Sequence, residues 1–200
     1  MVDAPQFSSN WFQKLAQDNF DNIIKPQFKG VKINYLEIGC FEGNSLTYMF
    51  NNVLTHPESH ATVIDPFDDF NNCKQQYNLF MNNMKPHLNQ IAAIQGYSQN
   101  ELPKLPANNF DFIYIDGDHT SNAAFVDAVL SFPLLKVGGY IIFDDYMWLH
   151  DGDHSIPDQN DPRLNHPNNP HSGVNNFVNL YKSHIEIVRS NWQMIIKKIN

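Results

Sequence analysis

The sequence predicts an α/β protein built on one doubly wound, mostly parallel sheet of seven strands, with an antiparallel hairpin at its C-terminal end. Short apolar runs alternate with segments whose apolar residues recur at helical spacing. Four of these runs end in acidic residues, namely Glu37, Asp65, Asp116 and the pair Asp144-Asp145. Because parallel sheets bind ligands at the carboxyl ends of their strands, we expect these acids to gather at one edge of the sheet.

The first half of the chain is predicted to hold three strands separated by helices. Residues 11–24 have helical spacing, and Pro26 and Gly30 are expected to end this helix. The first strand precedes Gly39, and residues 46–54 form a helix with one apolar face. The next elements are a strand at 61–64, a helical stripe from Tyr77 to Leu88 that closes near Pro86, and a strand at 91–94.

The second half is predicted to hold two central strands, a long loop and a hairpin. Residues 110–115 and 140–143 are continuous apolar runs, typical of strands buried on both faces, and a helix through 124–129 joins them. Residues 147–172 lack periodicity, and because so long a loop usually covers a site, we expect an active-site lid. The last elements are a helix at 174–181 and strands at 185–188 and 194–196, joined by a turn at 189–191.

Composition bounds the class of protein. The chain has 200 residues, 42% of them hydrophobic, so we expect a single domain over 1–200 in which residues 1–30 form a helical cover. The net charge of −8 argues against a nucleic-acid partner. Without a signal sequence or an apolar run of about eighteen residues, we expect a cytoplasmic protein with no membrane partner. Cys40 and Cys73 are too few for a disulfide framework, and the apolar N-terminal helix leaves a homo-oligomer open.

The glycine turn after the first strand has the character of a cofactor site. Gly39 and Gly43 allow the backbone to approach a ligand, and the helix that follows offers unpaired N–H groups at its N-terminus. A dinucleotide fingerprint would place glycine where Phe41 and Asn44 stand, which weakens a pyrophosphate interpretation.

Two acids near this turn point to a different ligand. Glu37 would repel pyrophosphate but can receive an ammonium group, and Asp65 is placed to accept hydrogen bonds from ribose hydroxyls. Together they describe an amino acid joined to a nucleoside. A nucleotide-dependent oxidoreductase and a non-catalytic nucleoside-binding module remain as alternatives.

Four motifs over residues 33–146 carry a family resemblance: Glu-x-Gly-x-x-x-Gly, Ile-Asp, Ile-Asp-Gly-Asp-His, and Gly-Gly-Tyr-Ile-Ile-Phe-Asp-Asp-Tyr. With them the chain resembles the class I S-adenosylmethionine-dependent methyltransferases, in particular the small, metal-dependent sugar and catechol O-methyltransferases. The resemblance implies a Rossmann-like fold and methyl transfer from S-adenosylmethionine to a hydroxyl oxygen of a small sugar, phenol or catechol. The expected cofactor-binding residues are Glu37, Gly39, Gly43, Ser45, Asp65, Tyr97, Ser98 and Asp116.

Asp116, Asp144 and Asp145 end strands that we expect to be neighbours, so their carboxylates should repel one another. Either their pKa values rise or a cation holds them, and hard oxygen ligands suit Mg²⁺ or a similar divalent ion. The family resemblance places metal ligands at the same three positions. Asp145 could instead bond only to backbone.

The catalytic base remains open between two residues. Related catechol enzymes have a lysine where this chain has His119, and related sugar enzymes use an aspartate at the position of Asp118. We expect His119 to be the base, because its ordinary pKa suits proton transfer at neutral pH. Both residues could instead cap the helix that begins near Ser121.

The histidines and acids of the 147–172 loop match neither zinc nor calcium ligand spacing, so we expect a solvated lid. Tyr146 and Trp148 are candidate stacking surfaces for an acceptor ring, although Trp148 could equally anchor the core. Arg163 is the loop's only strong cation.

Overall fold

The computed structural model describes residues 4–12, 14–68, 75–153 and 155–200, so Cys73 and His154 lie outside the described part of the chain. Its strands form one mixed sheet in the order β3-β2-β1-β4-β5-β7-β6, and the seven strands confirm the predicted sheet. The strands are β1 Asn34–Ile38, β2 His60–Asp65, β3 Ile91–Gln95, β4 Phe110–Ile115, β5 Leu135–Phe143, β6 Ile185–Ser190 and β7 Met194–Lys198. The chain divides into two compact units, Met1–Tyr97 and Ser98–Asn200.

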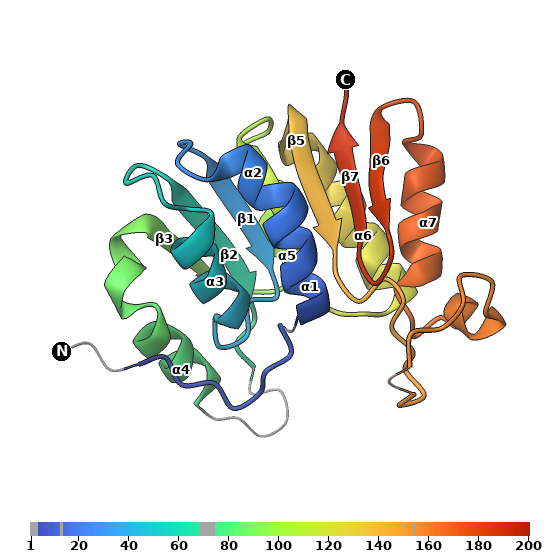
Figure 1. Cartoon of the computed structure of the whole chain (residues 1–200), viewed down its shortest axis with the longest axis horizontal. Coiled ribbons are helices and arrows are strands. Elements are labelled where there is room, and N and C mark those ends of the chain that lie inside the picture. The colour runs from blue at the N-terminus through green and yellow to red at the C-terminus, as the bar shows by residue number, and fades with distance from the viewer. Residues whose placement is uncertain (1–3, 13, 69–74, 154) are drawn as a thin grey trace. The chain divides into compact units, whose positions relative to one another are not determined.

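The first unit contains three parallel strands side by side, β3-β2-β1 (Figure 1). Helix α3 (Asn44–Asn52) follows the glycine turn and buries Leu46 and Met49, which confirms its predicted apolar face. Helix α4 (Gln76–Asn83) leads into a 3₁₀ helix, η3 (Lys85–Gln90). Of the apolar residues predicted to line one face of this segment, Phe80 is buried but Tyr77 is exposed. The buried apolar face is therefore shorter than the spacing of these residues suggests.

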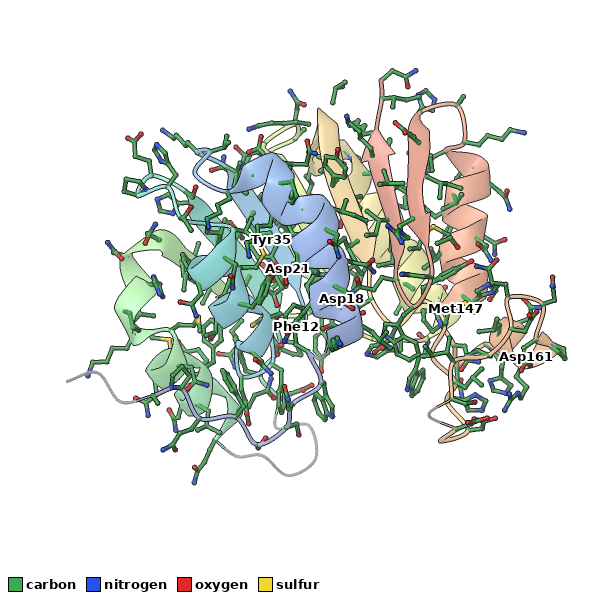
Figure 2. The ribbon with its side chains drawn as sticks, viewed as in Figure 1. Phe12, Asp18, Asp21, Tyr35, Met147 and Asp161 are labelled. Carbon is green, nitrogen blue, oxygen red and sulfur yellow. The ribbon has the colours of Figure 1, made fainter. Side chains whose placement is uncertain are left out.

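The N-terminal helix of this unit begins later than predicted and ends at Phe28, just before Gly30, which has a φ of 79° and agrees with its expected role in ending the helix. It runs through α1 (Lys14–Asn19), a π-helical segment η1 (Phe20–Ile24) and α2 (Lys25–Phe28). Pro26 does not end it, because the proline directly follows the π-helical segment and the helix continues through it to Phe28. Phe20 is fully buried, and Asp21 accepts a hydrogen bond from Tyr48 of α3 at 2.7 Å (Figure 2). This helix therefore packs on α3.

The second unit contains the parallel pair β4-β5 and the antiparallel strands β5-β7-β6, which confirms the predicted hairpin. Its turn lies after Ser190 rather than at 189–191, because a register shift between Ile187 and Arg189 lengthens β6. The helices of this unit are α5 (Ser98–Glu101), η4 (Leu102–Lys104), α6 (Ser121–Ser131), η5 (Phe132–Leu134), η6 (Pro162–Asn165) and α7 (His171–Leu180).

Helices α6 and α7 cross closely at Gly173. A Cβ atom added there would lie 1.9 Å from the carbonyl oxygen of Ser121, so only glycine allows this approach. The hydroxyls of Ser121 and Ser172 are 2.7 Å apart at the same crossing.

The loop between β5 and α7 is irregular apart from η6, as predicted, and Figure 1 shows it in orange extending beyond the start of α7. Figure 2 labels Met147 near the sheet and Asp161 in the outer part of this loop. In the described residues no helix is long and apolar enough to cross a membrane.

Candidate active site

The glycine turn depends on left-handed backbone. Gly39 and Gly43 have φ values of 81° and 82°, and Phe41 between them has a φ of 46°. The Gly39 N–H donates to the carbonyl oxygen of Ile64 at 2.9 Å, which ties the turn to β2. A side chain at Gly43 would be strained by its backbone and would crowd Met84 Cε at 3.1 Å. Both glycines are therefore required by the turn.

Glu37 lies behind this turn, fully buried on β1. Its carboxylate accepts hydrogen bonds from the Tyr35 hydroxyl at 2.9 Å and from the Ser45 hydroxyl at the start of α3. Burial raises the pKa of Glu37 to about 7, against the opposing effect of these two hydroxyl donors. The structure brings the predicted pair Glu37 and Ser45 together and closes both to solvent.

Asp65 joins three segments at the end of β2. Its Oδ2 accepts from the Phe41 N–H at 2.8 Å, and its Oδ1 accepts from the Phe67 N–H at 2.8 Å and from Nε2 of Gln76 at 3.2 Å. Burial raises its pKa, although the backbone donors oppose this change. Sequence reasoning missed Gln76, and the only signal for it is a polar residue next to the apolar stripe of α4.

An N-terminal strap, residues 6–11, lies on the glycine turn. The Ser8 N–H and hydroxyl both donate to the carboxylate of Glu42 at 2.6 Å, and Glu42 is 1% exposed. Nδ2 of Asn83 donates to the carbonyl oxygens of Gln6 and Glu42, each at 2.9 Å. The ring of Trp11 lies 4.8 Å from that of Phe41. The strap thus extends the predicted helical cover onto the glycine turn.

Tyr97 and Ser98, two of the predicted cofactor-binding residues, belong to different units. Tyr97, 52% exposed, donates its hydroxyl to Asp68 at 2.8 Å, close in sequence to Asp65. Ser98 begins α5 in the second unit and hydrogen-bonds the buried carboxyl group of Asp127. Burial raises the pKa of Asp127 to about 6.

In the second unit, Asp116, His119 and Asp145 converge. One ligand atom from each lies within 4.8 Å of the others, and this is the metal-sized group found among the described residues. Nδ1 of His119 is 3.3 Å from Oδ2 of Asp145, whose backbone is left-handed at a φ of 50°. A cavity of about 10 Å³, the size of a single water molecule, is lined here by Asp116, Asp118, His119 and Asp144.

Asp144 is directed elsewhere. Its carboxylate accepts hydrogen bonds from the Tyr114 hydroxyl and from Nε2 of Gln193, the latter at 2.9 Å, and also from the Asp145 N–H. Of the three predicted metal aspartates, the structure therefore gathers Asp116 and Asp145. His119, predicted as the base, completes the group.

Burial and neighbouring charges shift the pKa values of the ionisable groups in this cluster. Burial, and then the neighbouring charge of Asp144, raise the pKa of Asp145 to about 8. Burial lowers the pKa of His119, which the charges of Asp144 and Asp118 oppose. Two carboxylates and a neutral imidazole nitrogen are a donor set that divalent ions accept in proteins. The residues present therefore fit such an ion.

Asp118 and His119 do not cap α6. Thr120 holds that position, and its hydroxyl accepts from the Ala123 N–H at 3.3 Å. Oδ1 of Asp118 accepts from the Thr120 N–H at 2.9 Å.

The aromatic residues after β5 differ in their roles. Tyr146 is 4% exposed, packs 4.6 Å from the ring of His171 and donates its hydroxyl to Asn175 at 3.0 Å, so it anchors the core. Trp148 is half-buried, and its ring lies 5.4 Å from that of His119. Trp148 therefore borders the cluster on the side of His119.

Arg163 does not present its charge to a ligand. Its guanidinium pairs with Asp151 at 3.3 Å, Asp153 at 2.9 Å and Asp161 at 2.7 Å. Asn169, fully buried, accepts from the His150 N–H and donates to the carbonyl oxygen of Arg163. These bonds close the loop on itself.

Residues 36–146, which include the glycine turn and all four acidic strand ends, match the family model described as a methyltransferase domain. The chain belongs to this methyltransferase family. An uncharacterised protein of Acanthamoeba polyphaga mimivirus, R132, is 36% identical to this methyltransferase over 72% of its chain and 66% of the viral protein. Tapetum-specific methyltransferase 1 of Arabidopsis thaliana is 32% identical over 58% and 47% of the respective chains. The methyltransferase thus covers less than two thirds of either relative's length.

Solved structures confirm the Rossmann-like class I fold. An rRNA methylase of Clostridium thermocellum, described as putative, superposes with a TM-score of 0.67 at 13% identity, over 98% of this chain and 99% of its own. An O-methyltransferase of Bacillus cereus in complex with S-adenosylhomocysteine gives a TM-score of 0.61 at 18% identity, over 98% and 84%. At these identities the similarity establishes the fold.

Proposed function

We propose that this chain transfers the methyl group of S-adenosylmethionine to a hydroxyl oxygen of a small molecule, with a divalent cation at the acceptor. The convergence of Asp116, His119 and Asp145 carries the proposal, because a methyltransferase that acts on a hydroxyl must help it lose its proton. Sequence membership of the methyltransferase family and the S-adenosylhomocysteine in the Bacillus cereus structure support the cofactor.

The first unit would hold the cofactor. The glycine turn brings backbone close to the methionine part, and Asp65, held rigidly by two N–H donors, orients the ribose. Glu37 and Ser45, both buried, would support the turn from behind rather than face the ligand. Tyr97 and Ser98 would lie near the adenine.

The second unit would hold the acceptor. Asp116, His119 and Asp145 supply the ligands for a cation such as Mg²⁺, which lowers the pKa of a hydroxyl group when bound. Because Nδ1 of His119 faces Asp145 within this group, we assign the acceptor's proton to Asp118, which lines the same cavity. Trp148 offers a ring against which a flat acceptor can stack.

The net charge of −8, and the carboxylates that surround Arg163, favour a neutral or cationic small molecule over a nucleic acid. We assign the choice of acceptor to the 147–172 loop. This loop lies outside the four family motifs, so its sequence does not name the acceptor.

The test is calorimetric and then chemical. We expect S-adenosylhomocysteine to bind the purified chain, and NAD(H) not to bind. Incubation with S-adenosylmethionine and a panel of catechols, phenols and sugars should yield S-adenosylhomocysteine in a manner that EDTA abolishes and Mg²⁺ or Mn²⁺ restores. Absence of S-adenosylhomocysteine binding would refute the proposed cofactor. Methyl transfer that survives EDTA would show that the reaction needs no divalent cation. Transfer to ribosomal RNA alone would refute a small-molecule acceptor.

A further inference from the structure

Gln76 contains a buried polar atom that the packing of the first unit does not explain. The residue is the first of α4 and is 3% exposed. Its side-chain oxygen, Oε1, is buried and accepts no hydrogen bond among the described residues. Since buried carbonyl oxygens are nearly always paired, this atom points to a missing donor.

The orientation of the Gln76 amide is fixed by Asp65. Nε2 donates to Oδ1 of Asp65 at 3.2 Å, and an exchanged amide would set two oxygens against each other. The carboxylate cannot turn away, because the N–H groups of Phe41 and Phe67 hold its two oxygens. The unpaired Oε1 therefore lies beside the Asp65 carboxylate in one defined arrangement.

A carboxylate and an amide oxygen side by side form a pair of hydrogen-bond acceptors. A complementary group is a vicinal diol, which presents two neighbouring hydroxyl donors. Oε1 is buried, so a ribose reaches it only after the side chains that cover it move aside.

We infer that Gln76 binds the ribose of the cofactor together with Asp65, with Oε1 accepting a hydrogen bond from one of the two ribose hydroxyls. This inference rests on the proposed function, which supplies a nucleoside cofactor. It assigns Gln76 as a specificity-determining residue that distinguishes ribose from deoxyribose. Gln76 has this role in addition to orienting Asp65.

The experiment combines substitutions in the protein with deoxy analogues of the ligand, in the manner of a double-mutant cycle. Affinities are measured by calorimetry for S-adenosylhomocysteine and for its 2′-deoxy and 3′-deoxy analogues. The proteins are the wild-type chain, Gln76→Met, which nearly preserves volume, and Gln75→Met as a matched control on the adjacent, exposed glutamine. Thermal melting without ligand reports whether each variant folds.

Because Asp65 and Oε1 of Gln76 would each accept from one ribose hydroxyl, we expect the wild-type chain and Gln75→Met to bind both deoxy analogues about tenfold more weakly than S-adenosylhomocysteine. Gln76→Met should bind the analogue without the Gln76-facing hydroxyl within about twofold of S-adenosylhomocysteine, because the variant has no acceptor for that hydroxyl, and it should still bind the other analogue more weakly. Discrimination in Gln76→Met equal to that of the wild type would overturn the inference.

Two further outcomes are decisive even if Gln76→Met fails to fold. A wild-type chain that binds S-adenosylhomocysteine and both deoxy analogues equally would overturn the inference while leaving the proposed function in place. A wild-type chain that binds none of the three would overturn the proposed function itself.

Discussion

Nδ1 of His119 lies 3.3 Å from Oδ2 of Asp145, while the adjacent Asp144 bonds to Gln193. Two neighbouring aspartates at the end of β5 thus serve different partners. Both residues lie in the turn directly after β5, where Asp145 has a left-handed backbone with a φ of 50°. Asp144 fixes the strand end to the hairpin turn, and Asp145 is left to the cluster.

Asp145→Asn should weaken the binding of Mn²⁺ or Mg²⁺ by about tenfold or more, since it removes a charged ligand. Asparagine tolerates left-handed backbone, so the turn is preserved. Calorimetric titration with Mn²⁺ measures the loss. Asp158→Asn, the same change of charge in the outer loop, is the control, and a similar loss in both variants would show that only net charge matters.

Glu37→Gln should change how stability depends on pH. Between about pH 4.5 and 7 the folded chain holds a proton on Glu37 that the unfolded chain has released, so the free energy of unfolding falls as pH rises. The fall attributable to Glu37 is on the order of 3 kcal/mol. Glutamine does not titrate, and the variant lacks this contribution.

Urea unfolding at several pH values between 4.5 and 7.5 measures this effect. Asp65 and Asp127, whose pKa values are also raised, act in the same direction, so the informative quantity is the difference between variant and wild type. A difference that stays constant across this range would mean that Glu37 titrates normally.

Ser8→Ala should loosen the N-terminal strap. The variant loses a hydroxyl bond to a buried carboxylate, worth about 1 to 2 kcal/mol. We expect earlier proteolytic cleavage near residues 6–11 and altered Trp11 fluorescence, with faster release of S-adenosylhomocysteine in stopped flow. Ser9→Ala is the matched control, and equal cleavage of the two variants would rule out a clasp at Ser8.

Gly173→Ala should destabilise the second unit by about 3 kcal/mol, because its methyl group meets the backbone of Ser121. Gly152→Ala is the control for backbone strain without a steric clash, because Gly152 has a φ of 83° but open space around it. This variant should lower the free energy of unfolding by about 1 kcal/mol. Chemical denaturation compares the two. A smaller effect at Gly173 than at Gly152 would contradict close packing of α6 on α7.

The order of strands and helices could be predicted because it depends on periodicity, which local sequence records. The apolar run at 110–115 coincides with β4, and the helix after Gly43 begins where expected. Pro26 was misinterpreted because a π-helical segment precedes it, and sequence gives no signal for that wider turn.

The site was harder to predict, since side-chain direction depends on backbone angles and on distant partners. Nothing in the pair Asp144-Asp145 indicates which carboxylate turns toward His119. That choice depends on one positive φ and on Gln193, about fifty residues further along the chain. Gln76 could not be found from spacing, because its role follows from a contact with Asp65.

Arg163 and its three aspartates make the segment between β5 and α7 a self-contained insert, fastened mainly to itself. Such an insert can be exchanged or lengthened in evolution, or transplanted by an engineer, while the strands beneath it keep their register. A change of acceptor could then arise by replacing this one loop, while the glycine turn and the residues around it stay the same.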